Sequence, residues 1–101
     1  MDELLAMVRT ITPGTRVKTV GYDANDHGGM STVERVSDKE IHFRLDKAVR
    51  SQGRTFRTSC LRLDMLEDYE IDGRVLKIYN PSHAYVHGNR AIVKTIEFLE
   101  G

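Results

Sequence analysis

The chain has 101 residues, with 15 Lys and Arg against 15 Asp and Glu, and a single cysteine. This length predicts one domain, residues 1–101, and one cysteine excludes a scaffold held together by internal disulfides. A formal net charge of zero excludes a uniformly basic nucleic-acid coat protein and an acidic DNA mimic.

The first half of the chain predicts one short helix and three strands. Residues 2–9 favour a helix that Asp2 caps and whose apolar face carries Leu4, Leu5 and Val8. Residues 15–22 and 30–36 are rich in β-branched side chains, which is typical of strands. Residues 40–46 alternate between apolar and polar side chains, which indicates an antiparallel strand with one buried face.

The second half predicts shorter and less regular elements. Residues 47–53 read as a loop, and residues 54–63 as a fourth strand with a bulge near Cys60, where the apolar phase changes. Residues 64–73 are acidic and favour a turn, and residues 74–79 predict a fifth strand. The tail, residues 89–100, fits either a helix capped by Asn89 or a further strand, and we prefer the helix.

These elements predict a mainly β fold, with α+β character only at the ends of the chain. We expect a small antiparallel barrel or strongly bent sheet of four to six strands. A short N-terminal helix and a possible C-terminal helix would cover its open side. An SH3-like barrel is the specific expectation, because Arg16 to Val20, a Gly-Gly turn and Thr32-Val33 are similar to the first hairpin of such barrels.

Charge is segregated along the chain despite its zero total. Residues 44–62 hold six basic residues and one acid, whereas residues 63–72 hold five acids and no base. Pairing of the third and fourth strands would gather a basic face that could bind a phosphate backbone or an acidic protein. Phe56, the aromatic residue nearest this face, is expected to point inward. The candidate partner-binding residues are Arg44, Lys47, Arg50, Arg54 and Arg57.

Three other patterns suggest chemistry but match their motifs poorly. The loop Asp23 to Gly28, with Glu34 beyond it, has part of the spacing of a calcium loop, yet its flanks predict strands. His83 and His87 have the spacing of two metal ligands on a helix, but Pro81 and Gly88 make that helix doubtful. Cys60 with a histidine and an acid would form a thiolate site, but we expect Cys60 to be buried as a small apolar residue.

We therefore expect a non-catalytic binding or regulatory module that engages an acidic partner, either protein or nucleic acid. No catalytic residues, metal site or cofactor are expected. A small metal-dependent or hydrolytic enzyme that uses His27, His42, His83, His87 or Cys60 is the first alternative. A homo-oligomeric protein that associates through the apolar tail is the second. No leader and no apolar run long enough to span a bilayer are apparent, so we expect a cytoplasmic protein that does not bind membranes.

Overall fold

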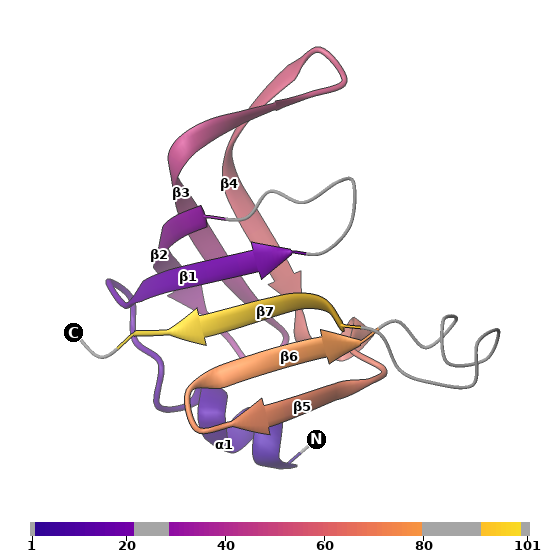
Figure 1. Cartoon of the computed structure of the whole chain (residues 1–101). Helices are drawn as coiled ribbons and strands as arrows, with labels where there is room; N and C mark the ends of the chain where they lie inside the picture. The colour runs from indigo at the N-terminus through magenta and orange to yellow at the C-terminus, as the bar shows by residue number, and fades with distance from the viewer. Residues whose placement is uncertain (1, 22–28, 80–91, 100–101) are drawn as a thin grey trace, which may run out of the picture.

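Figure 1 presents the structure of the chain, a computed structural model that describes residues 2–21, 29–79 and 92–99. Helix α1 (Asp2–Val8) precedes strands β1 (Arg16–Gly21), β2 (Gly29–Val36), β3 (Glu40–Ser51) and β4 (Arg54–Arg62). A 3-10 turn, η1 (Leu63–Met65), leads to β5 (Tyr69–Asp72), β6 (Val75–Tyr79) and β7 (Ile92–Phe98). The expectation of a mainly β fold with a short N-terminal helix is confirmed.

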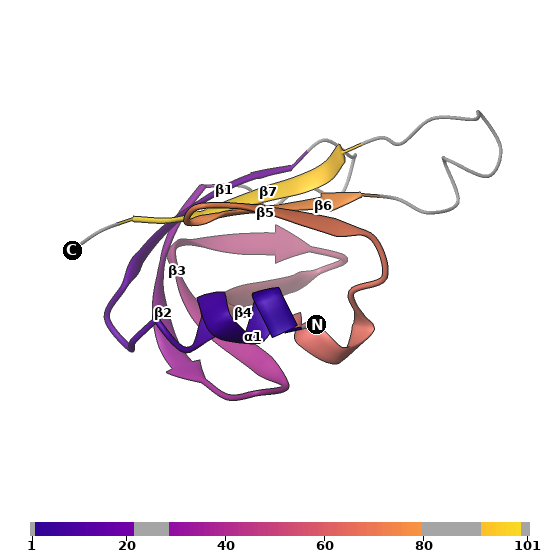
Figure 2. The same ribbon diagram turned by 90° about the horizontal axis from the view of Figure 1, so that it is seen from below.

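All seven strands belong to one antiparallel sheet in the order β4-β3-β2-β1-β7-β6-β5. The sheet bends strongly at β2, so that β3 and β4 face the layer formed by β1, β7, β6 and β5 (Figure 2). It does not close, because β4 and β5 are its two edges. The expected range of four to six strands was therefore too low, and the alternative of a strongly bent sheet describes the fold better than a barrel.

The core lies between the two layers and is covered at one end by α1 (Figure 2). Leu4 and Val8 of the helix are almost fully buried, as the apolar spacing of its sequence predicted. Phe43 of β3 and Phe98 of β7 pack across the interior with ring centroids 6.4 Å apart. These contacts hold the two layers together around the inner face of the sheet.

The tail forms strand β7, so the preferred prediction of a helix was wrong. β7 lies between β1 and β6 and forms backbone hydrogen bonds with both. Ile96 and Phe98 alternate into the core, whereas Ile92 remains 36% exposed. Pairing with a strand on each side makes the tail a strand, because its local pattern of apolar residues fits both the 3.6-residue period of a helix and the two-residue period of a strand.

The predicted loop over residues 47–53 was also wrong, since β3 continues to Ser51 and only Gln52 and Gly53 form the turn. Both turn residues have positive φ angles, 53° and 75°, which two-residue type I′ hairpin turns require. The register between β3 and β4 shifts between Arg44 and Val49, so the irregularity lies in β3 and not near Cys60. The acidic stretch, residues 64–73, was predicted as a turn, but it contains part of η1 and also β5, which was not predicted.

Candidate functional sites

The basic residues of the chain's centre gather on the β3–β4 hairpin, which projects beyond the rest of the sheet (Figure 1). The antiparallel register places Arg44 opposite Thr58, beside Arg57, and Arg54 opposite Ser51, beside Arg50. A common basic face requires the third and fourth strands to pair, and β3 and β4 do pair as expected. We call Arg44, Lys47, Arg50, Arg54 and Arg57 the basic hairpin.

Three acids near the basic hairpin form ion pairs with arginines, and only one of these arginines belongs to the hairpin. Arg44 forms an ion pair with Glu34 of β2 at 3.1 Å. Asp46 pairs instead with Arg16 of β1, through two hydrogen bonds of 2.8 and 2.6 Å. Asp64, from the acidic stretch, binds Arg62 at 3.2 Å. Four bases of the basic hairpin therefore remain that are exposed and have no ion pair with any residue the structure describes. They are Lys47, Arg50, Arg54 and Arg57.

An open cleft of about 690 Å³ borders the basic hairpin, over the part of the inner face that α1 does not cover. Its lining combines apolar residues, hydroxyl and amide residues (Thr19, Ser31, Gln52, Thr58 and Ser59) and two cations, Arg54 of β4 and Lys94 of β7. The apolar members include Phe43, Leu45, Val49, Phe56 and Ile96. A cleft of this composition suits an anionic group attached to an apolar body.

Every residue of β4 from Arg54 to Cys60 is exposed. Phe56 lines the cleft and is 44% exposed, so it is not buried in the core as an inward-pointing residue was expected to be. Cys60 is exposed as well, which corrects the prediction that it is a buried apolar residue. The physical reason is that β4 is an edge strand. Phe56 borders the open cleft, and Cys60 lies opposite His42 on the polar face of the strand pair.

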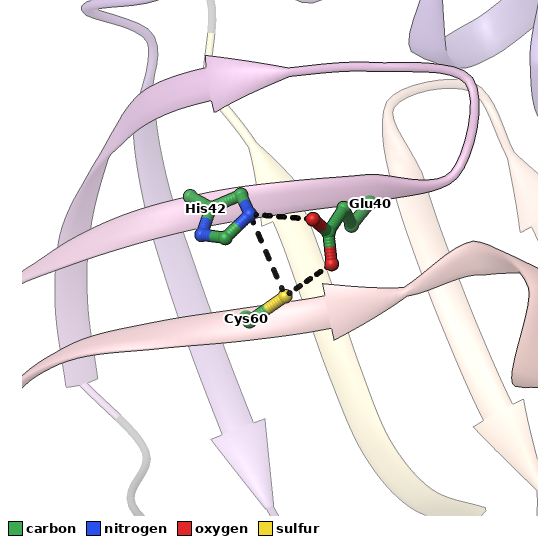
Figure 3. Close-up of side chains that lie close together, drawn as sticks. All are labelled: Glu40, His42 and Cys60. Atoms are coloured by element: carbon green, nitrogen blue, oxygen red, sulfur yellow. Dashed lines mark hydrogen bonds and ion pairs between the residues drawn. The ribbon is translucent and has the colours of Figure 1, made fainter.

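The second cluster lies on the outer face of the same two strands, where Glu40 and His42 of β3 meet Cys60 of β4 (Figure 3). His42 Nε2 is 3.0 Å from Glu40 Oε1 and 3.9 Å from Cys60 Sγ. The Cys60 thiol donates a hydrogen bond of 3.3 Å to Glu40 Oε2. His42 lies directly opposite Cys60 in the strand register, so the backbone pairing itself brings the three groups together.

The electrostatics of this cluster favour a protonated cysteine and an ionised glutamate. Desolvation raises the pKa of the Cys60 thiol, and its hydrogen bond to Glu40 raises it further. Hydrogen bonds from His42 and then from Cys60 hold the pKa of the Glu40 carboxyl below its usual value of 4.5. Arg62 Nε approaches the same carboxylate at 3.9 Å.

This geometry differs from that of a cysteine nucleophile activated by histidine. In such a triad the acid holds one ring nitrogen of the histidine while the other faces the nucleophile. Here Glu40 and Cys60 both lie against Nε2 (Figure 3). A raised thiol pKa also opposes formation of the reactive thiolate. The three donor atoms instead converge on one point, as ligands of a metal ion do.

Sequence reasoning named His42 and Cys60 separately and missed Glu40. The available signal was the alternation of residues 40–46, which places Glu40 and His42 on one polar face. The other candidates, His27, His83, His87 and the calcium-like loop Asp23 to Gly28, lie outside the described residues. Glu34 of that pattern is described, and it pairs with Arg44.

Comparison with known proteins identifies no relative of this chain. No protein-family model, curated protein or solved structure matches this chain. Within the described residues, no helix combines the length and the apolar character that a membrane span needs.

Proposed function

We propose that this chain is a non-catalytic binding module that engages an acidic partner through the basic hairpin. The observation that carries the proposal is that Lys47, Arg50, Arg54 and Arg57 are exposed without an ion pair among the described residues, while nearby acids bind other bases. Unpaired cations of this density on one projecting element attract polyanions over a range set by the ionic strength.

The free edge of β4 favours an acidic protein segment as the partner. Among the strands that the structure describes, β4 pairs with β3 alone, so the backbone groups on its other side could accept an added strand. An extended segment placed there would lie beside Arg54 and Arg57, which could bind its carboxylates. The SH3-like relationship stays an expectation, since an open seven-stranded sheet only approximates it.

Binding of fluorescently labelled acidic peptide and single-stranded DNA, measured by anisotropy at low and moderate salt, tests the proposal. We expect salt-sensitive binding of the peptide that replacing the four unpaired bases with alanine weakens by about ten- to a hundredfold, at roughly 0.2–1 kcal/mol per exposed charge pair. The matched control removes the same charge from exposed residues elsewhere. It carries alanine at Arg9, Lys18, Arg35 and Lys39.

Three outcomes would count against the proposal or redirect it. Equal weakening in the control variant would attribute binding to total charge and not to the hairpin. Absence of binding to either ligand at low salt would contradict the proposal altogether. Preferential binding of DNA, with a further loss in Phe56→Ala, would redirect it to a nucleic acid, because exposed aromatic rings stack on bases.

A further inference from the structure

We propose that Glu40, His42 and Cys60 form a binding site for a zinc-class divalent cation on the outer face of the β3–β4 hairpin. The site is separate in chemistry from the basic hairpin, so this inference goes beyond the proposed function. It rests on the spacing of three donor atoms, on their identity and on the strand pairing that places them.

The spacing fits a tetrahedral ion. With zinc bonds of about 2.3 Å to sulfur and about 2.0–2.1 Å to nitrogen and oxygen, two ligand atoms of a tetrahedral site lie about 3.3–3.6 Å apart. Cys60 Sγ lies 3.9 Å from His42 Nε2, and one atom from each of the three residues can be chosen so that all lie within 4.8 Å of one another. The two carboxylate oxygens face different partners, since Glu40 Oε1 is 3.0 Å from His42 Nε2 and Glu40 Oε2 is 3.3 Å from Cys60 Sγ. Small rotations of the side chains would bring all three atoms to bonding distance of one ion.

The donor set favours zinc over the common hard cations. A thiolate, an imidazole nitrogen and a carboxylate oxygen match the ligands of zinc sites, whereas magnesium and calcium prefer oxygen alone. Glu40 and His42 are partly exposed and Cys60 is exposed, so three protein ligands would leave a fourth position for water or for a donor atom from a bound partner. Zinc sites with three protein ligands have this open arrangement.

The strands hold the donors in place without a loop. Glu40 is opposite Arg62 and His42 is opposite Cys60, in an uninterrupted stretch of register from residue 40 to residue 44. The side chains of neighbouring pairs on one face of such a ladder lie close together whether or not a ligand is bound. The site is therefore largely preorganised by the sheet.

Binding must displace a proton and loosen one ion pair. The Cys60 S–H bond breaks, its proton passes to solvent, and the sulfur bonds to the ion. Arg62 gives up its contact with Glu40 and keeps its hydrogen bonds to Asp64. The positive charges of Arg62 and Arg35 act on the thiol and would partly oppose the cation. Because the thiol must lose its proton for the sulfur to bind the ion, affinity should increase as the pH rises.

Titration of the full chain with Co²⁺, under a reductant that contains no thiol, tests the site through the sulfur-to-cobalt charge-transfer band. We expect one ion per chain, displaced by Zn²⁺, and tighter binding at higher pH. Cys60→Ser should abolish the band. His42→Ala and Glu40→Gln should each weaken binding by at least about tenfold, since loss of even an outer-shell partner costs about 10- to 100-fold.

Two controls separate this site from its alternatives. The double variant His83→Ala and His87→Ala should bind Co²⁺ as the original chain does, and Arg62→Ala should bind it more tightly. Thermal melts with and without Zn²⁺ give a second measurement, and only chains with the complete cluster should melt at a higher temperature with the metal. No charge-transfer band, a band unchanged in His42→Ala, or binding that requires His83 and His87 would overturn the proposal.

Discussion

At the scale of single residues, stability depends on the few side chains that the two layers share. Ile41 is fully buried in β3, between β2 and β4. The sequence already showed that apolar and polar side chains alternate over residues 40–46, which predicted that the face carrying Ile41 is buried. Ile92 of β7 has the same side chain but is 36% exposed.

Ile41→Ala should therefore destabilise the fold by about 2–5 kcal/mol, because it removes buried methyl groups and leaves a cavity. The measurement is the free energy of unfolding in urea. Ile92→Ala is the matched control and should lose much less. Similar losses in the two variants would mean that Ile41 is not a core residue in solution.

The ion pair between Arg16 and Asp46 joins β1 to β3 across β2. Hydrogen bonds from Arg16 hold the pKa of the Asp46 carboxyl below its usual value of 3.8. A carboxyl with a lowered pKa in the folded state contributes stability at neutral pH that disappears as acid protonates it.

Asp46→Asn should consequently lower the urea midpoint at pH 7 and have little effect at about pH 2, where Asp46 itself is protonated. Asp38→Asn, in the exposed turn between β2 and β3, is the control and should leave the midpoint at pH 7 unchanged. A constant difference between Asp46→Asn and the original chain at every pH would contradict the ion-pair explanation.

At the scale of elements, the hairpin turn is the place where the local sequence fits its structure least well. Gln52 adopts a φ of 53°, a left-handed conformation that costs a residue with a Cβ roughly 1–2 kcal/mol. Asparagine tolerates this conformation, and Asn-Gly is the preferred pair for a two-residue turn. Gln52-Gly53 is a weaker sequence signal for such a turn than Asn-Gly, and the sequence prediction for residues 47–53 was a loop.

Gln52→Asn should therefore stabilise the protein by about 0.5–1 kcal/mol, a part of that conformational cost. Gly53→Ala should act in the opposite direction, since Gly53 has a φ of 75° and an added Cβ is strained there despite open space. Urea unfolding of both variants provides the measurement. Stabilisation by Gly53→Ala would exclude the tight turn.

At the scale of the whole molecule, the helix covers one end of the bent sheet and the other end remains open. The resulting cleft carries apolar side chains and the cations Arg54 and Lys94. The sequence predicted strands for many of the residues that line the cleft. The cleft itself forms only because β4 and β7 face each other across the bend of the sheet. Contacts between such distant parts of the chain are not encoded in local patterns.

An anionic aromatic probe, anilinonaphthalene sulfonate, should bind the native protein in this cleft. Arg54→Ala and Lys94→Ala should weaken its fluorescence response, whereas Lys18→Ala, an exposed change away from the cleft, should not. Near-ultraviolet circular dichroism must show that side-chain packing is retained, because the probe also binds loosely packed states. Equal responses from all variants would contradict binding in the cleft.

The sequence by itself determined the β-rich class, the N-terminal helix, most strand positions and the grouping of basic residues between 44 and 62. These depend on local periodicity and on neighbours in the chain, which physical chemistry relates directly to local structure. Only the tertiary structure decided that the tail is a strand, since Ile92 to Phe98 owes its conformation to pairing with both β1 and β6. It also decided that Cys60 is exposed and lies beside His42 and Glu40, because an edge position and a cross-strand register are relations between segments far apart in the chain.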